Sequence, residues 1–225
     1  NGVYSIANKF PNVFINFYNI LNLSWTETVS LHFDDEDRDE FLTETMTSLF
    51  KLFAAACFGI VACMPFVFPI LINEKYVAGY DQILILMYAM LFRVLVGLYS
   101  CIYVAQKNAK KIAYTSISAA IINITVNLIL INKIKIFAAS ISTLVAFFSM
   151  FIIRYIDVNK TVHMRIRKPI IIGSILIGTM LIGTYYCENK MIQLIALCIT
   201  AIYAVLTNVD MLKSGMKLVK SRFGK

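Results

Sequence analysis

Long apolar runs alternate with short polar connections along the whole chain. A bilayer core about 30 Å thick is crossed by roughly 20 apolar residues of helix, and seven runs approach or exceed that length. They are Val3–Leu31, Leu49–Leu71, Ile83–Val104, Ile112–Ile131, Ile136–Ile156, Ile170–Tyr186 and Met191–Val209. The pattern predicts an all-α, polytopic membrane bundle of about seven transmembrane helices. Composition supports this prediction, because 59% of the 225 residues are hydrophobic and only 15% are charged.

The first run differs from the others because polar side chains recur on almost every turn. At about 100° per residue these side chains fall within one sector of the helix. The sector, called the asparagine strip below, consists of Asn8, Asn12, Asn16, Asn19, Thr26 and Ser30. Lys9 and Glu27 border the strip, and the remaining surface is largely apolar. Pro11 lies inside the run, lacks a backbone N–H and is predicted to kink the helix.

Two interpretations of the asparagine strip are open. Asparagine side chains form hydrogen bonds between packed membrane helices, or they line a water-filled cavity that takes a polar ligand. The length of the strip favours the cavity, because one or two asparagines suffice for packing. Neutral amides also donate to and accept from sugar hydroxyls. We therefore take Asn8, Asn12, Asn16, Asn19 and Lys9 as candidate substrate-binding residues.

Two charged residues complete the candidate site. Arg93 lies at the centre of the third run, where an unpaired guanidinium costs several kcal/mol. It either forms a structural ion pair, with Glu27 or with an acid elsewhere, or binds an anionic substrate such as a phosphate. Glu27 is the one acid that we consider for coupling transport to an ion gradient.

Three further patterns predict packing rather than function. A face of small and polar residues in the fourth run predicts a helix-packing seam; it contains Ser116, Ala119, Ala120, Asn123 and Asn127. Arg154 and Asp157 are spaced i,i+3 and predict an ion pair. The acidic stretch at 33–45 predicts a short interfacial helix before the second run, or else a solvated loop.

The formal net charge is +8, from 21 Lys and Arg against 13 Asp and Glu. Alternate connections between the runs form two sets, and basic residues are denser in the set at 32–40, 106–111, 157–169 and 213–225. The positive-inside rule makes that side, and with it the C-terminus, cytoplasmic. The basic tail then acts as an orientation signal beside anionic lipid. We expect no nucleic-acid partner.

Sequence motifs for enzymatic chemistry are missing. There is no Gly-rich phosphate loop or dinucleotide motif. His32 and His163 lie in separate connections, and the five cysteines lack metal-ligand spacing. We therefore expect that the protein is not an enzyme and that it has no catalytic residues, no metal and no cofactor. The chain starts at Asn1 without a signal peptide, so we expect it to be a fragment of a longer protein.

Several segments occur in an order that resembles a known family. They are "GVYSIANKFP", "LYSCIYVAQKNAKK", "SAAIINITVNLILINKIKIFAASIST" and "FIIRYIDVNK". In that order they resemble the C-terminal half of the bacterial polysaccharide (O-antigen, Wzx-type) flippases of the multidrug/oligosaccharidyl-lipid/polysaccharide exporter superfamily. The turn before the fifth run departs from the family, with Asn132, Lys135 and Ala138 where Pro and Gly are usual.

The resemblance implies the C-terminal lobe of a two-lobed exporter. Residues 1–160 would correspond to transmembrane helices eight to twelve, and residues 161–225 to two added helices and a basic cytoplasmic tail. The implied function is to flip an undecaprenyl-pyrophosphate-linked oligosaccharide from the cytoplasmic to the outer leaflet of the bacterial inner membrane by alternating access. Its partners would be that lipid-linked sugar, the bilayer and the missing N-terminal lobe.

Three alternative functions predict different sequence features. A drug/cation antiporter of the same superfamily would place carboxylates in its cavity. An integral-membrane polysaccharide polymerase would carry a large catalytic loop. A structural membrane subunit would pair its asparagine strip with other helices and hold no water there.

Overall fold

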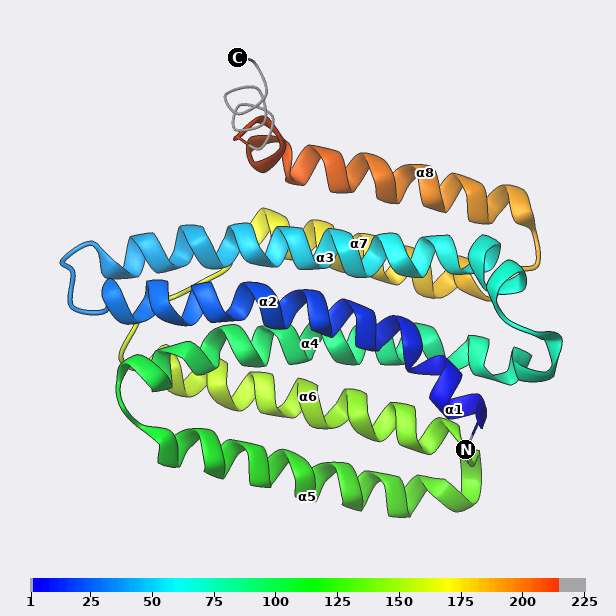
Figure 1. Cartoon of the computed structure of the whole chain (residues 1–225), viewed down its shortest axis with the longest axis horizontal. Coiled ribbons are helices and arrows are strands. Elements are labelled where there is room, and N and C mark those ends of the chain that lie inside the picture. The colour runs from blue at the N-terminus through cyan, green and yellow to red at the C-terminus, as the bar shows by residue number, and fades with distance from the viewer. Residues whose placement is uncertain (1, 215–225) are drawn as a thin grey trace.

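The computed structural model describes residues 2–214, with the backbone alone at residues 74 and 75. Within this range every regular element is helical, so the prediction of an all-α bundle is confirmed. The elements are α1 (Gly2–Ala7), α2 (Lys9–Leu31), α3 (Arg38–Leu71), the 3₁₀ helix η1 (Glu74–Gly79), α4 (Tyr80–Ala105), α5 (Ala109–Ile134), α6 (Phe137–Val158), α7 (Lys168–Tyr185) and α8 (Lys190–Thr207). The long helices lie side by side and run back and forth between two ends of the bundle (Figure 1).

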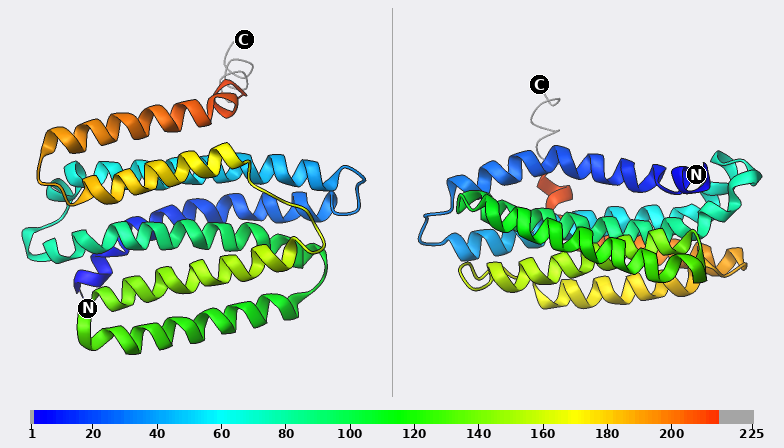
Figure 2. Two further views of the ribbon diagram at one scale, coloured as in Figure 1. Left: turned by 180° about the vertical axis from the view of Figure 1, so that it is seen from behind. Right: turned by 90° about the horizontal axis from the view of Figure 1, so that it is seen from below.

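Helix α4 is the centre of the bundle. It packs against α2, α3 and α6, while α5 packs on the outer side of α6. Helices α7 and α8 pack against α3 on the other side of the molecule (Figure 2). The most apolar window of α4 is 67% buried, whereas that of α5 is 11% buried. The burial of α4 follows from its sequence, since most of its residues are apolar and Arg93 is the one charged residue after the first turn.

Six of the described helices are long and apolar enough to cross a membrane, namely α3 to α8. The sequence predicted about seven, and the difference is α2, which is 23 residues long and lies alongside the others. Its asparagines and other polar residues lower its hydropathy below that of the six. The six apolar helices identify a multi-pass membrane protein.

Proline residues shape two of the helices. The helix is interrupted at Asn8, three residues before Pro11, and α1 lies at an angle to α2 in Figure 1, in agreement with the predicted kink, although Asn8 itself keeps helical dihedral angles. Inside α3, Pro69 has no N–H to donate to the carbonyl of Pro65 four residues earlier. The ammonium of Lys190 donates to that carbonyl at 3.0 Å instead. This contact ties the start of α8 to the last turns of α3.

The acidic stretch at 33–45 does not form a separate interfacial helix. Helix α3 already begins at Arg38, eleven residues before the predicted span, and runs unbroken for 34 residues. At about 1.5 Å per residue this is longer than a bilayer core. The first turns of α3 hold the connection at 159–167, because Glu44 pairs with Arg167 at 2.9 Å and Asp39 accepts from the backbone of His163 at 3.0 Å.

The turn between α5 and α6 is tight although the expected glycine is absent. It consists of Lys135 and Ile136, and Lys135 has φ 48° and ψ −120°. Side chains rarely adopt this conformation, whereas glycine does so at no steric cost. We expect Lys135→Gly to stabilise the protein by about 1 kcal/mol, measured by unfolding in mixed micelles. Lys133→Gly, inside α5, is the control and should be destabilising; equal effects would contradict the strain at residue 135.

The division into residues 1–160 and 161–225 stays a prediction. Helices α7 and α8 follow the proposed boundary and pack mainly on α3, and α7 also bonds to α4, where Tyr88 donates to the backbone oxygen of Gly178 at 2.8 Å. Tyr80 of α4 also stacks on Tyr185 of α7. The described part of the chain ends seven residues after α8. Most of the predicted basic tail, at 215–225, lies outside the described residues.

Candidate functional site

The apolar side of α2 fixes how the asparagine strip is presented. Phe14, Phe17 and Tyr18 surround Phe53 of α3, with ring centroids 5.4 to 5.9 Å apart. Around the axis of α2, Phe17 lies about 100° to one side of Tyr18, and Asn19 lies about 100° to the other side. The strip therefore lies on the side of α2 that is turned away from α3.

Three hydrogen bonds hold α2 on α4. The buried indole of Trp25 donates to the backbone oxygen of Leu98 at 3.1 Å. Next to it, the hydroxyl of Thr26 and the thiol of Cys101 lie 3.2 Å apart. Asn22, at the edge of the strip, accepts from the same thiol at 3.6 Å and from the Tyr18 hydroxyl at 2.5 Å. The polar atoms between α2 and α4 are thus matched inside the bundle, and α2 cannot rotate without losing these contacts.

The strip is uncovered along most of its length. Asn12, Asn16 and Asn19 are exposed, and no side chain among these three hydrogen-bonds to another residue that the structure describes. Asn8 donates to the backbone oxygen of Tyr4 one turn earlier at 2.8 Å. Thr26 and Ser30 likewise bond back to carbonyls of α2, and Thr26 also contacts Cys101 of α4. From Asn12 to Asn19 the described helices therefore do not use the strip as a packing surface, and this part is free for water, ligand or another helix.

Lys9 and Glu27, which border the strip, are both exposed. Neither forms an ion pair within the described range, and in particular Glu27 does not pair with Arg93. The strip thus carries a cation near the start of α2 and an anion one turn from its end.

Arg93 is exposed at the middle of α4. At about 100° per residue it projects between Gly97, which packs against Tyr18 of α2, and Ser100, which contacts α6. Its guanidinium carbon lies 5.9 Å from the centroid of the Phe147 ring on α6, within cation–π range. No described carboxylate pairs with Arg93. The structural ion pair, one of the two interpretations of this residue, is therefore not found within the described part of the chain.

A groove runs along the line where α5 packs on α6, and one of its lining residues is Phe147, the ring that Arg93 contacts. It has a volume of about 410 Å³ and a mainly apolar lining, in which Ser116, Asn123 and Thr143 are the polar residues. The amide of Asn123 donates to the hydroxyl of Thr143 at 3.4 Å, and Ala119 is buried against α6. The predicted small-residue packing seam is present, and the groove beside it carries a few polar groups.

These elements border one face of the bundle. Figure 1 places α5 and α6 on the side of α4 opposite α3, and the strip turns away from α3 as well. We call this surface the polar face. It consists of Asn12, Asn16 and Asn19 on α2, Arg93 on α4, Asn123 on α5 and Thr143 on α6. This set combines neutral donors and acceptors with one cation, Arg93, that pairs with no described carboxylate.

The predicted ion pair between Arg154 and Asp157 is wrong. Arg154 is 2% exposed, and its guanidinium donates to the hydroxyls of Thr115 and Ser100 and to the backbone oxygen of Val96. These acceptors on α4 and α5 are all neutral. They draw the side chain inward, where more hydrogen bonds are available than at the exposed end of α6. Arg154 is consequently a buried cation without a described acidic partner.

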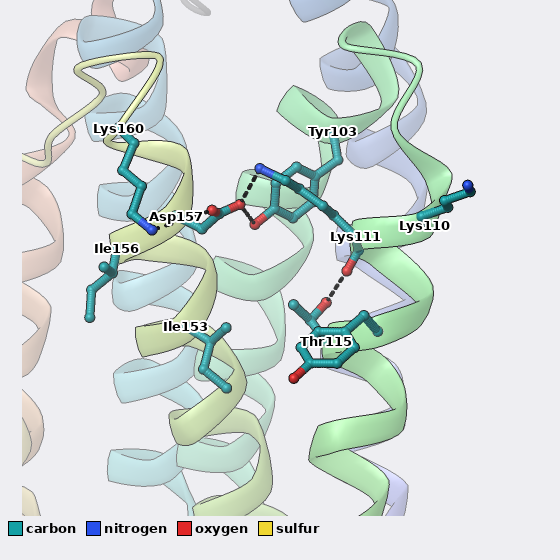
Figure 3. A pocket seen from close by; sticks show the side chains of 9 residues that line it. Tyr103, Lys110, Lys111, Thr115, Ile153, Ile156, Asp157 and Lys160 are labelled. Carbon is teal, nitrogen blue, oxygen red and sulfur yellow. Dashed lines mark hydrogen bonds and ion pairs between the residues drawn. The ribbon is translucent and has the colours of Figure 1, made fainter.

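Asp157 instead pairs with lysines. Its carboxylate accepts from Lys111 Nζ at 2.7 Å and from the Tyr103 hydroxyl at 2.9 Å, and Lys160 Nζ lies 3.8 Å away (Figure 3). The sequence analysis missed this cluster because Lys111 and Asp157 are 46 residues apart. The density of lysines at 107–111 and the aspartate near the end of α6 were the available signal.

Among the described residues no cluster of His, Cys, Asp or Glu could hold a metal ion. Comparisons with models of known protein families, with curated proteins and with solved structures find no match. The class of the molecule therefore rests on its own features: a multi-pass helical membrane protein with a polar, cationic face.

Proposed function

We propose that the protein is part of a flippase that moves an undecaprenyl-pyrophosphate-linked oligosaccharide from the cytoplasmic to the outer leaflet of a bacterial inner membrane. The observation that carries this proposal is the polar face. It joins a row of neutral amides suited to sugar hydroxyls with an unpaired guanidinium suited to a pyrophosphate. The resemblance to the polysaccharide flippases, drawn from the sequence, points to the same cargo.

We further propose that a second helical lobe faces the strip, and that the lipid-linked sugar passes between the two lobes. Exposed asparagines and an exposed arginine at the depth of the hydrocarbon core are costly beside lipid. A second lobe would enclose them in a water-filled path, as alternating access requires. In this arrangement Asn8, Asn12, Asn16, Asn19, Lys9 and Arg93 contact the cargo, and Glu27 is the candidate for ion coupling.

The proposed orientation places the connections at 32–37, 106–108 and 159–167 in the cytoplasm. These three connections lie at one end of the bundle (Figure 1). Basic residues gather at that end, including Lys107, Lys110, Lys160, Arg165 and Arg167. By the positive-inside rule the C-terminus is then cytoplasmic as well.

Cysteine labelling tests whether the polar face is accessible to water. In the full-length protein without its native cysteines, we expect Asn12→Cys, Asn16→Cys and Asn19→Cys to react quickly with a membrane-impermeant thiol reagent. Phe14→Cys, buried against α3 on the same helix, should react at least about tenfold more slowly, because buried thiols are inert. Ile20→Cys is exposed but apolar, and serves as the matched control for a position facing lipid. Equal, slow reaction at the three asparagine positions and at residue 20 would contradict the proposal.

A further inference from the structure

A second cationic site lies away from the polar face, at the basic end of the bundle. Here the start of α5 and the end of α6 enclose a cavity of about 520 Å³. Its lining carries three lysines, Lys110, Lys111 and Lys160, against one carboxylate, Asp157. On α5 the lysines lie about a third of a turn away from Ser116 and Asn123, which line the groove beside Phe147, and the buried Thr115 and Ala119 lie between the two pairs. The two sites are therefore on opposite sides of the line where α5 packs on α6.

The cavity is cationic at its outer end and apolar below. Lys111 and Lys160 converge on Asp157 near the mouth, whereas Lys110 extends away from this cluster (Figure 3). Tyr114, Ile153 and Ile156 line the part of the wall that continues toward the middle of the helices. This arrangement matches a lipid, which has a charged headgroup at the membrane surface and chains that run inward.

Arg154 supplies a second, independent feature of this site. Its buried guanidinium donates to Thr115, which lines the cavity, and lies 6.0 Å from the ring centre of Tyr103, which also lines it. Because every described acceptor around Arg154 is neutral, its charge is not compensated inside this part of the chain. An isolated buried charge is costly, and an anion in the neighbouring cavity would offset that cost.

We propose that this cavity binds the phosphate headgroup of an anionic phospholipid from the surrounding bilayer. Lys110 and Lys160 contact the phosphate directly, while Lys111 bridges it to Asp157. Asp157 lowers the net charge of the lining, but it also holds two lysines and the Tyr103 hydroxyl in place. Tyr114 and the two isoleucines contact the upper part of the acyl chains. The site is separate from the cargo path and does not depend on the proposed flippase activity.

Native mass spectrometry of the detergent-solubilised chain tests the proposal. Titration with phosphatidylglycerol should give one tightly retained lipid per chain, while phosphatidylcholine should be retained at least about tenfold more weakly. Inorganic phosphate at the same concentration should not displace the lipid, because it lacks acyl chains. The double variant K110Q/K160Q should bind phosphatidylglycerol roughly 30-fold more weakly, as expected for two lysines near a lipid surface. Both lysines are exposed, and the Lys111–Asp157 pair remains, so the variant should fold.

The matched control is K133Q/K135Q, which removes the same charge from two exposed lysines at the opposite end of α5. This variant should retain the lipid as the unchanged protein does. Equal losses in the two double variants would reduce the effect to net charge and overturn the site. Equal retention of phosphatidylcholine, or displacement by inorganic phosphate, would overturn the assignment to an anionic lipid.

Discussion

Replacing Arg93 by glutamine should lower delivery of polysaccharide to the cell surface roughly 10- to 100-fold, the effect of one charge-assisted hydrogen-bonded contact. Arg93 is the cation of the polar face. Its guanidinium contacts the Phe147 ring, and its N–H groups donate to no described residue. Glutamine keeps much of the length but removes the charge. Arg93→Lys keeps the charge but loses the bidentate geometry, so it should retain part of the activity. The measurement is surface polysaccharide in a flippase-deficient host that expresses the full-length protein.

Membrane abundance separates the two interpretations of Arg93. No described carboxylate pairs with Arg93, so we expect Arg93→Gln to accumulate in the membrane at the normal level. A parallel fall in abundance would indicate that an acid outside the described residues had lost its partner, which is the structural ion pair. Lys133→Gln, an exposed charge at the end of α5, is the control and should leave transport unchanged. Normal polysaccharide in Arg93→Gln would contradict a role in binding the cargo.

The helices themselves could be predicted from the sequence because the apolar runs are long. Hydropathy located the middle of the six apolar helices, and the periodicity of α2 separated the buried Phe14 and Val29 from the exposed asparagines, although Phe17 on the predicted apolar side is 44% exposed. The start of α3 was missed by eleven residues. Hydropathy detects only the part of a helix that is apolar, whereas the first turns of α3 are charged and continue the same helix beyond the bilayer core.

Contacts between helices were the part that the sequence could not predict. The i,i+3 spacing of Arg154 and Asp157 is compatible with an ion pair, but it contains no information on which helices lie nearby. In the folded chain Arg154 donates hydrogen bonds to Val96, Ser100 and Thr115. Asp157 forms its ion pair with Lys111. The groove that contains Phe147 depends in the same way on α5 packing against α6, so only its α5 part was predicted.

Gly97 makes the close approach of α2 to α4 possible. A Cβ atom added at Gly97 would lie 2.7 Å from Cζ and 3.1 Å from Cε1 of Tyr18. Tyr18 cannot easily move, because it is 5% exposed, packs edge-on against Phe53 and donates its hydroxyl to Asn22. The clash must therefore separate the two helices or displace the ring.

We expect Gly97→Ala to destabilise the protein by about 3 kcal/mol, the upper part of the range for overpacking a buried contact. The measurement is unfolding in mixed micelles, followed by circular dichroism. Gly59→Ala is the matched control, since nothing lies within 4 Å of a Cβ added in the middle of α3. Alanine favours a helix more than glycine does, so this control should be neutral or stabilised by up to about 1 kcal/mol.

A double-mutant cycle assigns the cost of Gly97→Ala to the tyrosine ring. In a Tyr18→Leu background the side chain is shorter and more flexible, and the further change of Gly97 to Ala should cost less than about 1 kcal/mol. The difference from the cost in the unchanged protein is the interaction energy between the two positions. If Gly97→Ala were as stable as Gly59→Ala, or if its cost were the same with leucine at residue 18, then Tyr18 would not set the spacing of α2 and α4. The asparagine strip would in that case be held in place by the other contacts of α2, chiefly the hydrogen bonds of Trp25, Thr26 and Asn22 to α4.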